Sequence, residues 1–265
     1  MEPSMGRRRI GTVRAIWRYP VKSMRGEALA RAYVGDRGIA GDREWALAET
    51  AYGGVVSARA FPRMLEARAF WTGDPARDAA ARVRIELPAG ATCDAGAPAA
   101  AAALGRMLKR DLRFERIRAA PLSAAEMDAI MRGEATPPRR DFFDEDVIHL
   151  VASGTLEHLR RLRPDADFDP CRFRPNVLVD TPGEERGFVE DQWLDGRLEI
   201  GAEVRIAGAR PALRCVVTTW PQDQLPHQPA VLRAAWEHHE AYVGVFAAVA
   251  AGGWITVGDE ITLTG

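Results

Sequence analysis

Cysteine is scarce in this sequence, and its three cysteines, Cys93, Cys171 and Cys215, lie far apart with no CxxC pair. This spacing excludes a self-contained iron–sulfur cluster, a structural zinc site of the usual cysteine kind and an even-numbered disulfide framework. Free thiols are typical of a reducing compartment. The sequence therefore predicts a cytoplasmic protein with no iron–sulfur cluster of its own.

The chain also lacks a surplus of charge and a long apolar run. Its 265 residues carry a formal net charge of -1, with 28% charged and 47% hydrophobic residues. Without a basic surplus, a nucleic-acid partner is not expected. No apolar run approaches the roughly 20 residues of a membrane span, and residues 1–6 contain no apolar part of a secretory signal. These features predict a soluble globular protein without a membrane partner.

Several motifs of common enzyme classes are missing as well. The sequence has no HExxH, no GxSxG and no GxGxxG pattern, which disfavours zinc hydrolases, serine hydrolases and dinucleotide-binding enzymes. The histidines are predicted to be mostly structural. His149 falls within an expected strand, and the neighbours His238 and His239 point about 100 degrees apart on an expected helix, so they do not face one metal easily.

What the sequence does contain is many short β-branched segments separated by glycine and proline, which predicts a mostly β fold with a few covering helices, an α+β chain. Helices are expected over 97–110, 123–132, 154–162 and 230–240. Periodicity is lost over 119–146, around Pro137 and Pro138. That loss predicts a boundary between two domains, 8–120 and 121–265.

The segment 210–219 contains Cys215, which has the most reactive side chain of the strand expected over Leu213–Thr219. Cys215 follows Arg214 directly. A thiolate is a soft metal ligand and a nucleophile, and a nearby cation favours the thiolate form. A lone cysteine in an apolar strand is more often a small buried hydrophobe. In a regular strand the two side chains would point to opposite faces, so they can serve one ligand only if the backbone is irregular there.

A second polar cluster lies at 171–176, where an extended chain is expected from Phe173 to Asp180 because Pro175 disfavours a helical conformation for Arg174. Alternation would then place Arg172, Arg174 and Asn176 on one face, an arrangement that suits an anion such as phosphate. A solvated strand edge with salt bridges is an equally good interpretation.

A third cluster is the loop 19–26, which contains Lys22 and Ser23. An ammonium, a hydroxyl and backbone N–H groups in a tight loop can hold a phosphate, although such a segment is more often only a loop. In the following loop, Arg43 either pairs with Asp42 or remains available for a ligand, and the spacing leaves both possibilities open.

Together these segments resemble the MOSC proteins, which are named for the C-terminal domain of molybdenum cofactor sulfurase. The N-terminal third resembles the MOSC N-terminal β-barrel domain that accompanies it. The resemblance rests on six motifs in order: Tyr-Pro-Val-Lys-Ser (19–23), Gly-Asp-Arg (41–43), Arg-Phe-Arg-Pro-Asn (172–176), Glu-Asp-Gln-Trp (190–193), Arg-Cys-x-x-Thr-Thr (214–219) and Gly-Asp (258–259).

The resemblance implies a β-barrel-like domain that binds the molybdenum cofactor, a pyranopterin dithiolene with a terminal phosphate. In the redox-active branch, which includes the mitochondrial amidoxime-reducing component, the motif cysteine ligates molybdenum, and the matching residue here is Cys215. The family's cofactor-binding positions correspond to Lys22, Ser23, Arg43, Arg174, Asn176 and Arg214, and more loosely to Ser153 and Thr155.

The function that follows from the resemblance is a molybdenum-cofactor oxidoreductase acting on N-hydroxylated or N-oxide-type small molecules. Because the sequence contains no cysteine cluster, the electrons are expected from a separate donor protein. Two alternatives remain open: a sulfur carrier that holds a persulfide on Cys215, and a carrier of the cofactor without turnover of its own.

Overall fold

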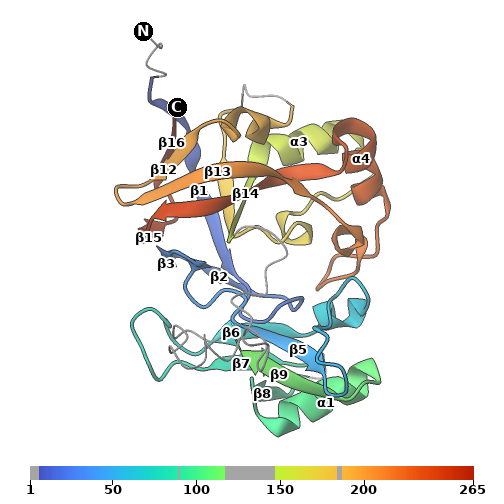
Figure 1. Cartoon of the computed structure of the whole chain (residues 1–265). Coiled ribbons are helices and arrows are strands. Elements are labelled where there is room, and N and C mark those ends of the chain that lie inside the picture. The colour runs from blue at the N-terminus through green and yellow to red at the C-terminus, as the bar shows by residue number, and fades with distance from the viewer. Residues whose placement is uncertain (1–5, 89, 117–146, 184–186) are drawn as a thin grey trace, which may run out of the picture.

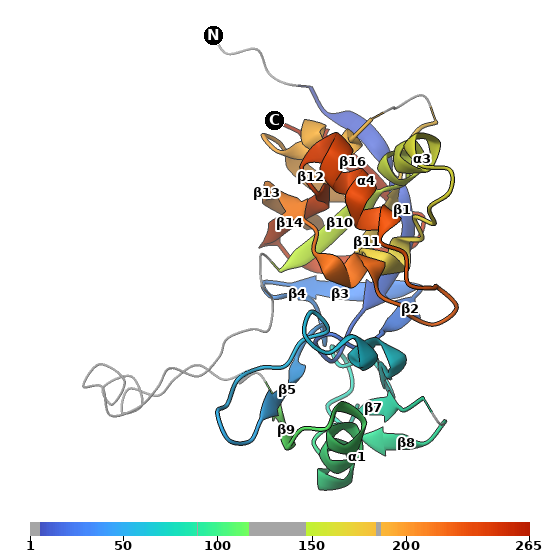
Figure 2. The same ribbon diagram turned by 90° about the vertical axis from the view of Figure 1, so that its right-hand side faces the viewer.

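The structure is a computed structural model that describes residues 6–88, 90–116, 147–183 and 187–265. It consists of two lobes stacked end to end (Figure 1). We call the larger one the barrel lobe; it contains residues 8–39 and the described residues from 147 onward. The other, residues 45–116, is the small lobe. Strands of the segment 27–39 lie between the barrel and the small lobe (Figure 2).

The barrel lobe is built on a closed sheet of seven strands in the order β11-β10-β14-β13-β12-β16-β1, closed by pairing of β1 with β11. All neighbours are antiparallel except β10 and β11. The barrel strands are β1 (Arg8–Arg18), β10 (Ile148–Ala152), β11 (Val177–Asp180), β12 (Arg197–Ile200), β13 (Val204–Leu213), β14 (Tyr242–Ala251) and β16 (Glu260–Thr264). The prediction of a mostly β fold with a barrel is confirmed.

Shorter elements surround the barrel. The strands are β2 (Glu27–Leu29), which extends the sheet beyond β1, and the group β15 (Gly253–Thr256), β3 (Arg31–Gly35) and β4 (Gly38–Ile39). The helices are α3 (Ser153–Leu162) and α4 (Ala230–His239), with 3-10 turns η2 (Pro170–Arg172), η3 (Val189–Trp193) and η4 (Val216–Thr219). In the described chain no helix is long and apolar enough to cross a membrane.

The small lobe has a core of its own, which includes Leu47, Leu65 and Leu104. Its elements are β5 (Trp45–Glu49), η1 (Pro62–Glu66), β6 (Arg68–Trp71), β7 (Val83–Glu86), β8 (Thr92–Asp94), α1 (Pro98–Leu108) and β9 (Leu112–Arg116). The alanine-rich stretch forms α1 as predicted. Pro98 occupies the first turn, where its missing N–H costs nothing, and Lys109 ends the helix in the left-handed conformation.

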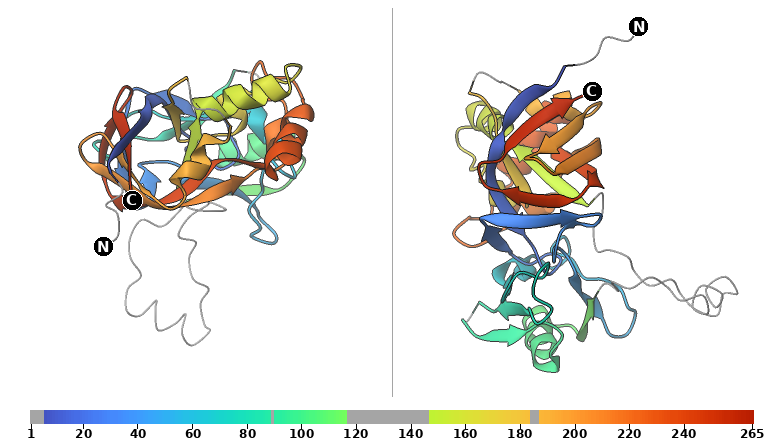
Figure 3. Two further views of the ribbon diagram at one scale, coloured as in Figure 1. Left: turned by 90° about the horizontal axis from the view of Figure 1, so that it is seen from above. Right: turned by 90° about the vertical axis from the view of Figure 1, so that its left-hand side faces the viewer.

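The predicted division near residue 120 lies outside the described residues, as does the expected helix 123–132. Strand β1 lies beside β16 (Figure 3), and Ile10, Val13 and Ile16 pack in the barrel core with residues of the C-terminal half. The N-terminal strand thus belongs to the barrel lobe. Such long-range pairing leaves no trace in the local periodicity on which the division was based.

The prediction of a strand over Leu213–Thr219 is wrong beyond its first residue. Strand β13 ends at Leu213, and the 3-10 turn η4 follows. Threonine hydroxyls can bond to carbonyls of the preceding turn and so compete with strand pairing. Thr218 Oγ1 donates to Cys215 O at 3.0 Å, and Thr219 Oγ1 donates to Val216 O at 2.7 Å. These bonds override the β preference of the branched side chains.

Candidate functional site

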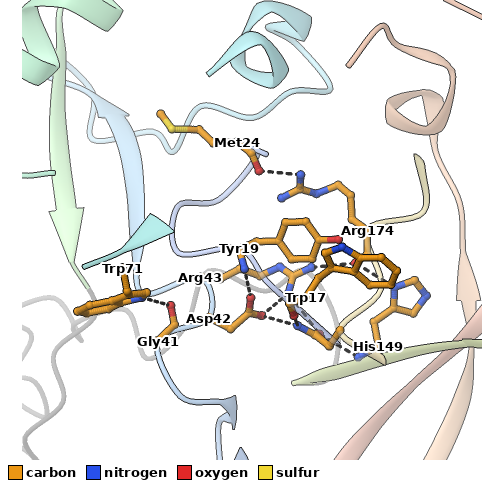
Figure 4. Close-up of polar contacts among 10 residues, drawn as sticks. Trp17, Tyr19, Met24, Gly41, Asp42, Arg43, Trp71, His149 and Arg174 are labelled. Carbon is orange, nitrogen blue, oxygen red and sulfur yellow. Dashed lines mark hydrogen bonds and ion pairs between the residues drawn. The ribbon is translucent and has the colours of Figure 1, made fainter. Parts of the chain in front are cut away.

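A cluster of three arginines lies at the end of the barrel that faces the small lobe. Arg43 comes from the loop before β5, Arg174 from the turn before β11, and Arg214 from the end of β13. The guanidinium carbons of Arg43 and Arg174 lie 5.0 and 4.2 Å from the ring centroid of Tyr19 (Figure 4). We call Arg43, Arg174 and Arg214 the arginine cluster.

Asp42 fixes the first of these arginines. Its buried carboxylate accepts a hydrogen bond from Tyr19 N at 2.6 Å, one from Asn176 Nδ2 at 3.1 Å and an ion-paired one from Arg43 Nη1. Asn176 is fully buried, and its Oδ1 accepts from His149 N at 3.1 Å. The sequence left two possibilities for Arg43, and the structure shows the one in which it pairs with Asp42. This ion pair fixes the orientation of the Arg43 guanidinium at the interface of the two lobes.

Gly41 allows this loop to approach the small lobe. Its φ is +82°, and a Cβ there would lie 2.5 Å from Trp71 Nε1, whose N–H donates to Gly41 O at 3.0 Å. Gly41→Ala is expected to destabilise folding by about 2 kcal/mol, since it adds a clash to the strain of a positive φ.

Gly90 provides the matched control for this substitution, because its φ is +81° and nothing lies within 4 Å of its Cβ position. In urea unfolding, Gly90→Ala should lower the free energy of unfolding only by the part that is due to backbone strain. Equal losses for the two variants would show that the approach of Trp71 does not matter.

Arg174 is almost fully buried, with 9% of its surface exposed, and it adopts a left-handed backbone with φ 54°. Its Nη1 donates to Met24 O at 2.7 Å. Burial lowers its pKa to about 10; the Tyr19 hydroxyl opposes this shift and the charge of Arg43 adds to it. The chain was expected to be extended from Phe173 onward, but the strand begins only at Val177.

Arg214 is tied to the same turn. Its Nη2 donates to Phe173 O at 2.7 Å, and its Nη1 lies 3.3 Å from His149 Nε2. Burial lowers the pKa of Arg214 to about 10; Cys215 opposes this shift, and the charges of Arg43 and Arg174 add to it. The three cations thus repel one another at close quarters, and a bound anion would relieve that repulsion.

His149 completes this corner as a neutral imidazole. Burial lowers its pKa well below the usual value, and the charge of Arg214 adds to the shift. Its Nδ1 lies 3.3 Å from Arg174 O, which can only accept a hydrogen bond. The proton therefore belongs on Nδ1, and Nε2 accepts from Arg214. His149 is buried in β10, as a structural histidine would be. Its contacts with Arg174 O and Arg214 were not part of that prediction.

Cys215 is the second residue after the end of β13 and is half-buried, with a free thiol. Its backbone, with φ -121° and ψ -179°, leads into η4 rather than continuing the strand. The irregular backbone that would let Cys215 and Arg214 serve one ligand is therefore present. The two side chains are close enough for their charges to influence each other.

The predicted loop residues Lys22 and Ser23 lie in the same region. The loop is fixed by Lys22 N donating to Trp45 O at 2.8 Å and by the contact of Met24 O with Arg174. Ser23 has a φ of 67°, which turns the chain sharply at this point. Of the residues assigned from the resemblance, Lys22, Ser23, Arg43, Arg174, Asn176, Arg214 and Cys215 are brought to one end of the barrel.

Ser153 and Thr155 are not brought there. They lie at the start of α3, at the opposite end of β10 from His149. Ser153 Oγ contacts Asp180 Oδ1 at 3.4 Å, and Thr155 Oγ1 donates to a carboxylate oxygen of Glu190. In this structure both hydroxyls bond to neighbouring segments of the barrel lobe and lie away from the arginine cluster.

Arg172 also differs from its predicted place beside Arg174 and Asn176. It is fully buried in η2, and its guanidinium donates to Thr218 O at 3.4 Å and to Pro226 O at 3.0 Å. It thereby supports the turn that follows Cys215. The error arose because alternation holds only in a regular strand, and the chain is a 3-10 turn here.

Sequence reasoning assigned no role to Tyr19 and left that of Asp42 open. Tyr19 is 4% exposed, and its hydroxyl has no hydrogen-bond partner among the described residues. A signal was present in both cases: a tyrosine before the proline of a polar loop, and an acid beside an arginine after a glycine. Neither pattern shows by itself that the two residues meet.

Two protein-family models match this chain, one in each half. The model of the MOSC N-terminal beta barrel domain matches residues 10–114, and the model of the MOSC domain matches residues 137–262. The chain belongs to the MOSC domain family. That family is associated with binding of the molybdenum cofactor.

Among solved structures, the chain is similar to the YuaD protein from Bacillus subtilis, with 12% identity, a TM-score of 0.49 and coverage of 98% of this chain and 97% of that one. A protein described as hypothetical has 14% identity and a TM-score of 0.34 over 48% of this chain and 57% of its own. A comparison with curated proteins gives no match.

The residues at the arginine cluster fit the group with which the family is associated. Arg214 Nε is buried without a hydrogen-bond partner among the described residues, and the three cations suit a phosphate. Within the described ranges no three His, Cys, Asp or Glu side chains gather as a metal site.

Proposed function

We propose that this protein is a molybdenum-cofactor oxidoreductase that reduces N-hydroxylated or N-oxide-type small molecules, with Cys215 as the protein ligand of molybdenum. The observation that supports it is the position of Cys215. A half-buried free thiol follows Arg214 on an irregular backbone, beside two more guanidinium groups where the two lobes meet. When bound, the cofactor supplies the metal centre for two-electron removal of an oxygen atom.

The chain's own residues would position that group. Arg43, Arg174 and Arg214 supply fixed cations for the phosphate, and the loop of Lys22 and Ser23 lies next to them. Because Asp42 and Asn176 lock Arg43 before anything binds, little conformational entropy is lost on binding. Neutral His149 accepts from Arg214 without adding a fourth positive charge.

The proposal includes a separate protein as electron donor, a small-molecule substrate and a cytoplasmic location. Two other functions use the same residues. A sulfur carrier would hold a persulfide on Cys215, favoured by its free thiol beside a cation. A cofactor carrier would use the arginine cluster without turnover.

The deciding experiment is molybdenum analysis of the protein made in a host that produces molybdenum cofactor. We expect close to one molybdenum per chain in the wild type and a severalfold lower content, or a changed metal spectrum, in Cys215→Ser. Cys171→Ala is the matched control, since burial raises the pKa of that thiol to about 12 and keeps it protonated. It should retain the metal.

Benzamidoxime reduction with an artificial electron donor then separates the three functions. Turnover that requires Cys215 supports the reductase, and bound molybdenum without turnover of N-oxygenated compounds supports the carrier. Absence of molybdenum from the wild type, together with a cyanide-labile sulfur on Cys215, would reject the reductase in favour of sulfur transfer.

A further inference from the structure

A second candidate site lies between the lobes, beside the arginine cluster but not within it. It is a cavity of about 540 Å³, within the size range of small-molecule sites. Its lining includes Arg174 but none of Lys22, Ser23, Arg43, Arg214 or Cys215. The cavity therefore shares one wall with the residues assigned to the cofactor and otherwise uses different ones.

One wall of this cavity is formed by Tyr19, whose side chain carries a polar group that the described chain leaves unsatisfied. The hydroxyl of Tyr19 is buried without a partner in the described chain, a situation that costs free energy unless a ligand or water bonds to it. Next to it lies the guanidinium of Arg174, stacked on the Tyr19 ring at 4.2 Å (Figure 4). Together they offer a hydroxyl and a cation to one acceptor group.

The cavity thiol, Cys171, does not act as a nucleophile. Burial, together with Asp169, raises its pKa to about 12, so that it is a protonated S–H group at neutral pH. Asp169 Oδ1 accepts from the backbone N of Cys171 at 2.7 Å. This side of the cavity therefore supports binding of a ligand and not covalent chemistry.

The charges at the outer part are already paired. Arg25 Nη1 lies 2.9 Å from Asp223 Oδ1, and Arg68 Nη1 lies 3.7 Å from Glu86 Oε2. A dianion such as phosphate would be repelled by these carboxylates and by Asp169. A single negative charge placed at Arg174 avoids most of that repulsion.

Part of the remaining lining is apolar. The indole of Trp17 lies beside Tyr19 and Arg174 (Figure 4), and Ala28 and Leu225 add aliphatic surface, while the amide side chains of Gln222 and Gln224 also line the cavity. An aromatic ring packs well against such surfaces. A carboxylate on the ring could accept from both Arg174 and the Tyr19 hydroxyl.

We propose that this interlobe cavity binds a small planar aromatic monocarboxylate, with its carboxylate at Tyr19 and Arg174 and its ring against Trp17. The site is separate from Cys215, and the proposal stands whether or not the protein is a reductase. We call it the carboxylate cavity.

The probe for the test is 4-fluorobenzoate, observed by fluorine NMR in solutions of the full-length protein. Tyr19→Phe keeps the ring under both arginines and removes only the hydroxyl. It should weaken binding roughly tenfold or more, the loss expected for one hydrogen bond to a charged group. The same variant should melt at a higher temperature without the probe, because the unsatisfied hydroxyl is gone.

Arg214→Met serves as the control, because Arg214 does not line the cavity, and it should bind the probe as the wild type does. The uncharged 4-fluorobenzyl alcohol should not bind measurably to the wild type or to this variant. The proposal is overturned if the wild type does not bind 4-fluorobenzoate, if Tyr19→Phe binds it equally well, or if Arg214→Met abolishes binding, which would assign the probe to the arginine cluster.

Discussion

Glu190→Gln is expected to abolish a loss of folding stability that the wild type undergoes as the pH rises from 4.5 to about 7. Glu190 is 3% exposed and lies in η3, where it meets the start of α3. It accepts a hydrogen bond from Ala152 N at 2.7 Å and another from Thr155 Oγ1. Burial nevertheless raises its pKa from 4.5 to about 7, because desolvation outweighs these bonds.

The sign follows from proton binding. Between pH 4.5 and pH 7 the folded protein keeps a proton on Glu190 that the unfolded chain has already released. Stability is therefore highest below pH 4.5, as far as this group is concerned, and falls as the pH rises through 7. A pKa that rises from 4.5 to about 7 corresponds to a loss of roughly 3 kcal/mol across the window.

Glutamine has nearly the same shape and does not titrate. Its amide oxygen can accept from Ala152 N, and its NH₂ group can donate to Thr155 Oγ1. Urea unfolding of wild type and Glu190→Gln at several pH values measures the difference, with the exposed neighbour Asp195→Asn as control. Parallel pH profiles for wild type and Glu190→Gln would show that Glu190 titrates normally.

The local signals of the sequence predicted the elements that depend on local interactions. Helix α1 was predicted from its alanines and ends within two residues of the expected boundaries. Helix α4, Ala230–His239, was also expected. The mostly β architecture followed from many short β-branched segments. These features are decided by propensity and periodicity within a few residues, and such information is contained in the segment itself.

Features that depend on distant partners were not predicted in this way. Closure of the barrel needs β1 to pair with β11, more than 150 residues later. The direction of Arg172 depends on carbonyls of the turn after Cys215. The resemblance named residues of distant segments that the structure brings to one end of the barrel, which local periodicity could not do. Ser153, which corresponded only loosely, instead contacts Asp180 and Thr181 beside α3.

Arg214→Met is expected to leave the ligand-free protein about as stable as the wild type and to abolish its stabilisation by phosphate. The lowered pKa, from 12.5 to about 10, means that the folded state disfavours this charge at neutral pH by roughly 2–3 kcal/mol. Methionine removes that cost. It also removes the hydrogen bond to Phe173 O, and an unpaired carbonyl costs about 1–3 kcal/mol. The two effects nearly cancel.

Binding should respond very differently from stability. A phosphate in the arginine cluster would be held by charge-assisted bonds and would relieve the repulsion among three cations, so loss of Arg214 should weaken it about 100-fold or more. Thermal unfolding with increasing inorganic phosphate, a stand-in for the terminal phosphate of the cofactor, measures this as a shift in Tm. The wild type should be stabilised and Arg214→Met should not.

Arg205→Met is the matched control, because Arg205 lies on the same strand β13 but forms a surface ion pair with Glu199 at 3.0 Å. It should keep the full response to phosphate. If Arg214→Met instead loses several kcal/mol of stability and still responds to phosphate, the arginine is a structural tie between β13 and Phe173. In that case the cations for the cofactor must be sought in Arg43 and Arg174 alone, and the position of Cys215 beside Arg214 would no longer argue for a shared ligand.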